Sequence, residues 1–372
     1  MSSAQLMLEC PVCGRTWAPD ARIWQCPCGG LLELRDRPPF SQPAIQVPTS
    51  IWRYRAMLPI REDQHIVSLG EGMTPLIPVD VGGQTLDCKL EFLSPTGSYK
   101  DRGAAVMISM LREIGVTAIS EDSSGNAAAS VAAYAARAGI HTRIFVPADT
   151  SPAKLTQISS YGAELVRVSG GRQNAALAAQ EDMDTSRSSS YYASHNYNPF
   201  FLEGLRTLAY EIWEQTRPNV PDWVVAPVGN GGLLVGVYRG FRDLRLAGLI
   251  PRVPHMLAVQ ARACAPIYNA YSHNAEQVEP IEGGVTLAEG IRISHPVRGV
   301  QVLEAIRASS GLIVTVDDDQ IIEAQALLAH QGLFVEPTSA TVVAALLRLP
   351  AGMLEGARVV AILTGSGLKA IH

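Results

Sequence analysis

The chain has 372 residues, of which 47% are hydrophobic and 17% are charged, and its formal net charge is -5. This length and apolar content suffice for one large or two medium domains, each with a core of its own. Because the chain has no basic excess, we expect no nucleic-acid partner.

The first ten residues carry neither a basic region nor a long apolar run, so we expect no secretory signal. The longest apolar stretch, residues 127–138, is rich in alanine and is interrupted by Arg137. It is too short to span a membrane, so we expect no membrane partner. A cytoplasmic location is the resulting prediction.

Four of the six cysteines form two close pairs near the N-terminus, and each pair is followed by glycine. These residues are Cys10, Cys13, Cys26 and Cys28. Two such pairs are typical of a zinc ribbon or a rubredoxin-like knuckle, in which four thiolates surround one metal. Disulfides and an iron–sulfur cluster are the alternatives, and a cytosolic setting disfavours disulfides. Residues 1–36 are therefore predicted to be a small appendage held together by a metal, because so short a segment hardly builds a core unaided.

Residues 37–66 are rich in proline and polar residues and predict a linker that wraps onto the body. From residue 116 onward, apolar runs typical of strands alternate with runs typical of helices. The predicted strands are 116–119, 142–146, 164–168, 223–226, 256–259 and 358–363. The predicted helices are 104–111, 127–137, 153–160, 175–182, 201–215, 233–244, 321–331 and 340–349. This alternation predicts an α/β fold of mostly parallel sheets with helices on both faces. The serine-rich residues 186–190 predict a surface loop.

Lys100 follows loop-forming residues at 94–98 and precedes the apolar run 104–111. The lysine is therefore predicted to lie at a loop-to-helix junction, near helix N–H groups and the positive end of the helix dipole. A cation is not favoured there, and desolvation adds to the preference for a neutral, nucleophilic amine. A neutral lysine in an α/β protein indicates a Schiff base with an aldehyde cofactor, and an ordinary surface lysine is the alternative.

Three further turns follow predicted strands. The segment 123–126, Ser-Ser-Gly-Asn, forms a turn that faces an anion or a cofactor, although Asn126 is also a candidate helix cap. The segment 229–232, Gly-Asn-Gly-Gly, either exposes backbone N–H groups to a phosphate or forms only a tight bend. Thr364 and Ser366 place hydroxyl groups at the carboxyl end of a strand, where open α/β sheets bind ligands.

Together these four segments resemble the β-family, or fold type II, of pyridoxal-phosphate enzymes, and within it threonine synthase and its paralogues. Further matching segments are Ser68–Leu76, Leu202–Thr207 and Val335–Ala340. The resemblance runs in the family's order from about Ser68 to the C-terminus. Some threonine-synthase-like proteins also carry a similar N-terminal cysteine segment.

The resemblance implies two doubly wound domains with the cofactor in the cleft between them. By that resemblance the small α/β domain covers residues 103–210 and the large one covers 211–372. Residues 37–102 would supply the linker and the first part of the large domain.

The resemblance also implies roles for single residues. Lys100 would bind the aldehyde of pyridoxal 5'-phosphate and later carry the α-proton of the substrate. Asn126 would hydrogen-bond to the phenolic oxygen of the cofactor, and Thr364, with Ser366 as competitor, would face the pyridine nitrogen. A neutral hydroxyl there leaves the ring a weaker electron sink, which suits β-elimination and replacement better than transamination. The residues that would donate backbone N–H groups to the phosphate are Gly229, Asn230, Gly231, Gly232 and Leu233.

The substrate carboxylate would be bound by hydroxyls and helix-end N–H groups at Thr96, Ser123 and Ser124, for which turn formation is the alternative. His195 either touches substrate or is a packed histidine.

The lead function is that of a lyase in amino-acid metabolism, which eliminates phosphate from O-phosphohomoserine and adds water to give threonine. The alternatives are a serine/threonine dehydratase, another β-replacement enzyme, or a non-catalytic paralogue, against which Lys100 argues. The chain departs from the threonine synthase pattern at Phe201, which stands where that family has an arginine that reaches the substrate phosphate. Arg206 is the candidate replacement for this cation. The sequence does not determine the exact substrate or the oligomeric state, for which a homodimer is one possibility.

Overall fold

The computed structural model describes residues 6–20, 23–43, 49–185, 190–350 and 352–370. The chain forms two compact units. The first comprises residues 1–71 and 100–204, and the second comprises residues 72–99 and 205–372. The segment boundaries inferred from the family resemblance stay predictions.

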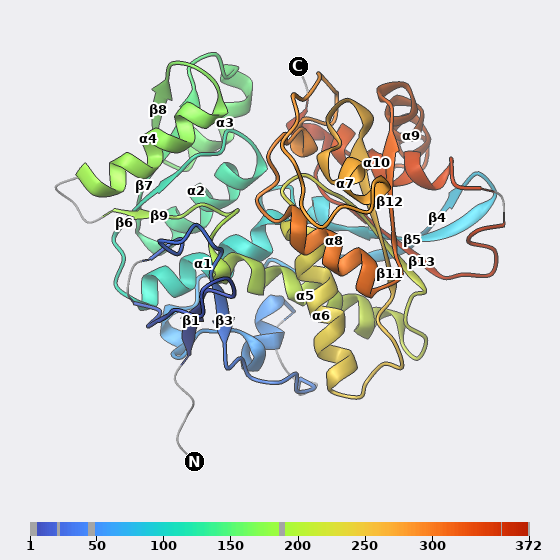
Figure 1. The fold of residues 1–372 in the computed structure, drawn as a ribbon, viewed down its shortest axis with the longest axis horizontal. Coiled ribbons are helices and arrows are strands. Elements are labelled where there is room, and N and C mark those ends of the chain that lie inside the picture. The colour runs from blue at the N-terminus through green and yellow to red at the C-terminus, as the bar shows by residue number, and fades with distance from the viewer. Residues whose placement is uncertain (1–5, 21–22, 44–48, 186–189, 351, 371–372) are drawn as a thin grey trace. The chain divides into compact units, whose positions relative to one another are not determined.

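The first unit contains a four-stranded parallel sheet in the order β8-β7-β6-β9 (Figure 1). Its strands are β6 (Ala118–Glu121), β7 (His141–Pro147), β8 (Glu164–Val168) and β9 (Tyr191–Tyr192). Its helices are α1 (Lys100–Glu113), α2 (Asn126–Ala138), α3 (Pro152–Ser160) and α4 (Arg172–Thr185).

Helices cover both faces of this sheet, as two successive residues of β7 show, because successive side chains of a strand point to opposite faces. Ile144 of β7 packs in a cluster with Ala132 of α2 and Leu155 of α3. The next residue, Phe145, packs with Ala179 of α4 in a separate cluster. Helices α2 and α3 therefore lie on one face and α4 lies on the other, and the turn after β6 leads directly into α2.

The first unit also carries the N-terminal appendage, a small antiparallel sheet in the order β2-β1-β3. Its strands are β1 (Met7–Glu9), β2 (Thr16–Trp17) and β3 (Glu33–Arg35). The predicted linker forms two short 3-10 helices, η1 (Ile51–Met57) and η2 (Asp63–His65). Ile51 and Tyr54 of η1 are fully buried, so much of this segment packs against the protein body.

The second unit is built on a six-stranded sheet in the order β12-β11-β10-β13-β5-β4, in which β4 alone runs antiparallel to its neighbour. Its strands are β4 (Leu76–Val81), β5 (Gln84–Leu90), β10 (Trp223–Pro227), β11 (His255–Ala261), β12 (Leu312–Val316) and β13 (Val359–Leu363). Its helices are α6 (Gly232–Leu246), α7 (Pro266–Ser272), α8 (Gly299–Ala308), α9 (Asp318–His330) and α10 (Pro337–Leu346), together with most of α5 (Pro199–Thr216).

The core of this sheet is formed by alternate residues of the central strands with one side of α9 and α10. Val225, Leu257 and Val359 pack with Leu328 of α9 and Val343 of α10. This burial on both faces of the strands is the reason that their sequences read as continuous apolar runs.

The predicted α/β class with mostly parallel sheets is confirmed, and several boundaries are corrected. The predicted strand 116–119 runs instead from Ala118 to Glu121, and the predicted helix 340–349 runs from Pro337 to Leu346. Of the predicted loop 186–190, only Ser190 lies within the described residues, and it is buried rather than exposed. Among the residues that the structure describes, no helix is long and apolar enough to cross a membrane.

Candidate active site

Lys100 is the first residue of α1, so it lies at the loop-to-helix junction that its sequence context predicts. Its side chain is half-buried, and its Nζ lies 5.9 Å from the centroid of the Phe201 ring. The preceding residue, Tyr99, belongs to the second unit, where its backbone N–H donates to the carbonyl of Thr364 at 3.0 Å.

The turn between β6 and α2 contains three predicted site residues. Gly125 is the N-cap of α2 and Asn126 is its first helical residue, so the side chain of Asn126 does not occupy the capping position. The hydroxyl of Ser123 accepts the N–H of Gly125 at 3.3 Å, and Ser124 is half-buried. Because the first N–H groups of a helix lack partners within it, this turn can bind an anion.

The glycine turn between β10 and α6 is constrained by close packing. A Cβ at Gly229 would lie 3.0 Å from Ile293, and one at Gly231, whose φ is +94°, would lie 2.6 Å from Val302. The side chain of Asn230 accepts the N–H of Val297 at 3.2 Å. Glycine is thus required at 229 and 231 for packing. The turn leads directly into α6, whose first N–H groups have no partners inside the helix.

Thr364 follows β13 and is 1% exposed. Its hydroxyl lies 3.0 Å from the hydroxyl of Ser339 on α10. Ser366 caps the short helix η6 (Gly367–Lys369) by accepting the N–H of Leu368, so its hydroxyl already has a structural use. Thr96 is buried, and its carbonyl accepts a hydrogen bond from Lys369 at 2.8 Å.

The predicted site residues are divided between the two units. Lys100, Ser123, Ser124 and Asn126 belong to the first unit. Thr96, the glycine turn at 229–233 and Thr364 belong to the second.

Glu121 is a titratable group that sequence reasoning missed. It ends β6, is fully buried, and its Oε1 lies 2.7 Å from Nδ1 of His195. Burial, with a smaller contribution from Asp122, raises the pKa of Glu121 well above its usual range, and a backbone hydrogen bond from His195 and, less strongly, the charge of Lys100 oppose this shift. The signal in the sequence was a carboxylate at the carboxyl end of an apolar strand, just before a ligand-facing turn.

Phe201 and Arg206 both lie on α5, as the predicted helix 201–215 implies. Phe201 packs so closely on α1 that a Cβ at Gly103 would clash with its ring. The guanidinium of Arg206 lies 3.1 Å from Asp243 in the C-terminal half of α6, and the hydroxyl of Tyr210 donates to the same carboxylate at 2.6 Å. Arg206 is therefore ion-paired within the second unit.

The four N-terminal cysteines come together in one cluster. Their sulfur atoms all lie within 4.8 Å of one another, with Cys10 3.6 Å from Cys28 and Cys13 3.5 Å from Cys26. A Cβ at Gly30 would lie 2.5 Å from the sulfur of Cys10, which explains the second of the two glycines that follow Cys28.

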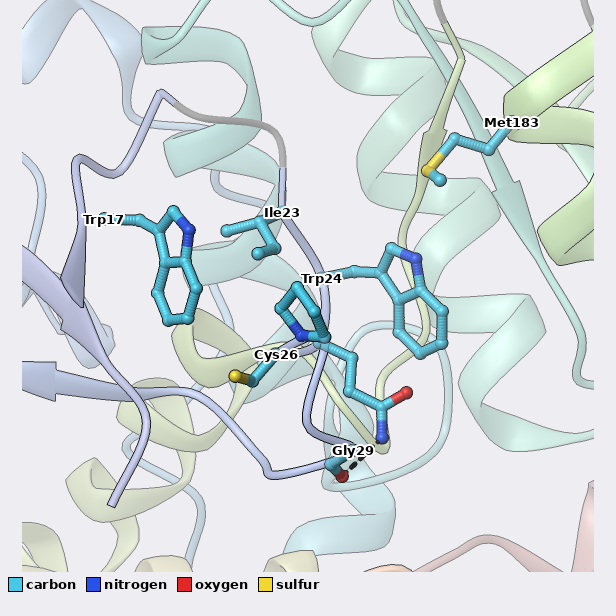
Figure 2. Close-up of a pocket in the computed structure, with 8 residues that line it drawn as sticks. Trp17, Ile23, Trp24, Cys26, Gly29 and Met183 are labelled. Carbon is cyan, nitrogen blue, oxygen red and sulfur yellow. Dashed lines mark hydrogen bonds between the residues drawn. The ribbon is translucent and has the colours of Figure 1, made fainter. Parts of the chain in front are cut away.

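A pocket of about 570 Å³ lies beside this cluster and is lined mainly by the appendage (Figure 2). Its walls include Trp17 and Trp24 of the appendage and Met183 of α4. Trp24 also contacts the rings of Tyr192 and Tyr197 edge to face, with centroid distances of 4.9 and 5.1 Å. Aromatic packing thus joins the appendage to the rest of the first unit.

Comparison with known proteins gives consistent results. A family model described as pyridoxal-phosphate dependent enzyme matches residues 67–365. The chain is 37% identical to the threonine synthase of Methanocaldococcus jannaschii, over 98% of this chain and 93% of that protein. It is 35% identical to the threonine synthase of Methanosarcina acetivorans, over 97% and 92% of the two chains. Among solved structures, a threonine deaminase from T.th. is similar with a TM-score of 0.65 and 27% identity, covering 79% of this chain and 92% of that one.

Proposed function

Because this chain belongs to the family of pyridoxal-phosphate-dependent enzymes, as a lyase of the threonine synthase type, we propose that it converts O-phosphohomoserine into threonine. The observation that supports this substrate is the similarity to threonine synthases over nearly the whole chain, including the cysteine segment. An amino-acid substrate is common to this type of enzyme.

The described residues fit the cofactor. Close packing demands glycine at 229 and 231, which keeps these two positions of the turn free of side chains where backbone N–H groups would hold the phosphate. We assign to Lys100 the covalent bond to the cofactor aldehyde, to Asn126 the hydrogen bond to its phenolic oxygen, and to Thr364 the contact with its pyridine nitrogen. When bound, the cofactor supplies an electron sink for the substrate carbanion.

The remaining roles belong to the substrate. Lys100 carries the α-proton, and Thr96, Ser123 and Ser124 bind the carboxylate through hydroxyl and N–H groups. Because Thr364 offers a neutral hydroxyl, a cofactor bound here would have a ring that is a weaker electron sink, which would favour elimination and replacement over transamination.

A second candidate, a serine/threonine dehydratase, is favoured by one observation. By the family resemblance, Phe201 would stand where threonine synthases carry a phosphate-binding arginine, and Arg206, the candidate replacement, is ion-paired with Asp243. A charge-assisted hydrogen bond is worth roughly 1.5–3 kcal/mol, so the loss would weaken phosphate binding about tenfold to a hundredfold unless another cation compensates.

The test compares kcat/KM for O-phosphohomoserine, O-phosphoserine, serine and threonine, with release of phosphate, ammonia and threonine measured in parallel. Threonine formation from O-phosphohomoserine as the most efficient reaction supports the proposal. Ammonia release from serine or threonine at a higher kcat/KM would select the dehydratase instead.

We further propose that Cys10, Cys13, Cys26 and Cys28 hold one structural zinc ion. Tetrahedral Zn–S bonds of about 2.3 Å place sulfur atoms about 3.8 Å apart, close to the separations of 3.5 and 3.6 Å in the cluster. Four thiolates leave no open coordination position, so the ion would stabilise the appendage and take no part in the reaction.

A further inference from the structure

The pair formed by Glu121 and His195 has no role in the reaction as described so far. The Oε1 atom of Glu121 lies 2.7 Å from Nδ1 of His195, and both side chains are buried. The second carboxylate oxygen, Oε2, is buried and has no hydrogen-bond partner among the described residues. Burying an unpartnered carboxylate oxygen is unfavourable, so its persistence at a strand end points to a use in a site.

The pair lies near Lys100 within the first unit. The ring of His195 contacts the Phe201 ring at a centroid distance of 5.7 Å, and Nζ of Lys100 lies 5.9 Å from the same ring. Lys100 is also close enough to Glu121 for its positive charge to lower the pKa of that carboxyl, against the larger effect of burial.

Other charged and titratable groups also face Glu121. Asp122 raises the pKa of the Glu121 carboxyl, and Arg172 of α4 lowers it. Tyr192 of β9 donates a hydrogen bond to Asp122 at 2.8 Å.

We propose that Glu121 and His195 are positioning residues that share one exchangeable proton and pass it to and from the amine of Lys100. This inference rests on the proposed function, in which Lys100 carries the α-proton of the substrate. When the proton leaves Lys100, one N–H bond breaks, the electron pair stays on Nζ, and the pair of residues takes up the proton. The same transfer in reverse restores Lys100, and nothing is oxidised or reduced.

The charge of the pair determines the sign of its effect. Without the shared proton the pair carries a net charge of -1, and with it the net charge is 0, so the proton belongs to the pair and to neither residue alone. Where the pair lacks the shared proton, replacing Glu121 by glutamine removes this negative charge from the surroundings of Lys100. A positive charge at the end of the Lys100 side chain then loses a stabilising neighbour, so the absorbance of the bound cofactor should titrate at lower pH.

The experiment uses the holoenzyme in four forms: wild type, Glu121→Gln, His195→Gln and Tyr192→Phe. Tyr192→Phe is the matched control, because it also removes one buried hydrogen bond to a carboxylate at the end of β6. The measurements are kcat and KM for O-phosphohomoserine across pH, and the pH titration of the visible absorbance of the resting holoenzyme.

In Glu121→Gln we expect kcat to fall at least tenfold, while KM changes less than about threefold. For comparison, a group that acts as general acid or base typically contributes about 10²–10⁴ to the rate. The midpoint of the absorbance titration should move down by about one pH unit, as expected for the loss of a nearby opposite charge. His195→Gln should lower kcat similarly, and Tyr192→Phe should change neither measurement.

The inference would be overturned if Glu121→Gln and His195→Gln both kept the wild-type kcat and the wild-type midpoint of the absorbance titration. It would also be overturned if Tyr192→Phe lost as much activity as they do, because equal losses would indicate a structural role. If Glu121→Gln does not fold, His195→Gln decides by the loss of kcat relative to Tyr192→Phe, because His195→Gln keeps the carboxylate of Glu121. Borohydride trapping of the cofactor on Lys100 and threonine formation in the wild type test the proposed function separately. If both succeed while the variants behave like wild type, only this inference fails.

Discussion

Replacing Arg206 by methionine should destabilise the protein without weakening substrate binding. The side chains of Arg206 and Asp243 are 9% and 16% exposed, and their charged groups lie 3.1 Å apart. Breaking a buried ion pair costs about 3–5 kcal/mol because the remaining charge is left without its partner. Asp243 keeps one donor in the hydroxyl of Tyr210, so we expect the lower end of that range, about 3 kcal/mol. In a unit of about 200 residues, this loss corresponds to a fall in Tm of roughly 6–12 °C.

Helix geometry is the reason that binding should survive. Arg206 follows Phe201 by five residues on α5, so its side chain points about 140° away from that of Phe201 around the helix axis. Its partner Asp243 lies about 16 Å along α6 from the glycine turn at the start of that helix.

The assay combines thermal unfolding of the holoprotein with kcat/KM for O-phosphohomoserine. The double variant Arg206→Met/Asp243→Leu is the control, because removing both charges should restore most of the lost stability. Unchanged Tm together with a tenfold or larger rise in KM would refute the reasoning and make Arg206 the phosphate-binding cation.

The remaining predictions concern the cofactor, the metal and the glycine turn. Lys100→Ala should abolish the visible absorbance of bound cofactor and turnover together, and full activity in this variant would contradict the assignment of the lysine. Elemental analysis should find one zinc per chain, and Cys10→Ser should reduce that content and the stability of the appendage while kcat changes less than about twofold; freshly prepared, reduced protein without metal would count against the site. Gly231→Ala should weaken cofactor binding and lower the free energy of unfolding by at least about 2 kcal/mol, because the new Cβ combines a positive φ with a clash against Val302. Gly248→Ala is the control, because its φ is also positive but no atom lies within 4 Å of its new Cβ. Equal losses of unfolding free energy in the two variants would argue against the clash with Val302.

The sequence alone was sufficient for features that depend on a few neighbouring residues. Loop formers followed by an apolar run placed Lys100 at a helix start, and glycines after the apolar strand 223–226 predicted the turn before α6. The β8 strand, Glu164–Val168, was predicted to the residue. Such signals are local because apolar periodicity and turn chemistry act over a few positions of the chain.

Only the tertiary structure decided which charges and hydroxyls find one another. Glu121 and His195 are 74 positions apart, and nothing near either residue predicts that they share a hydrogen bond. The sequence offered Arg206 as a cation for the substrate phosphate, yet folding places it against Asp243, 37 positions away. The partner of a buried polar group depends on how distant segments pack, because a group removed from water must find its hydrogen bonds within the folded protein. The residue types at the site are therefore a property of the sequence, whereas their protonation and pairing are a property of the fold.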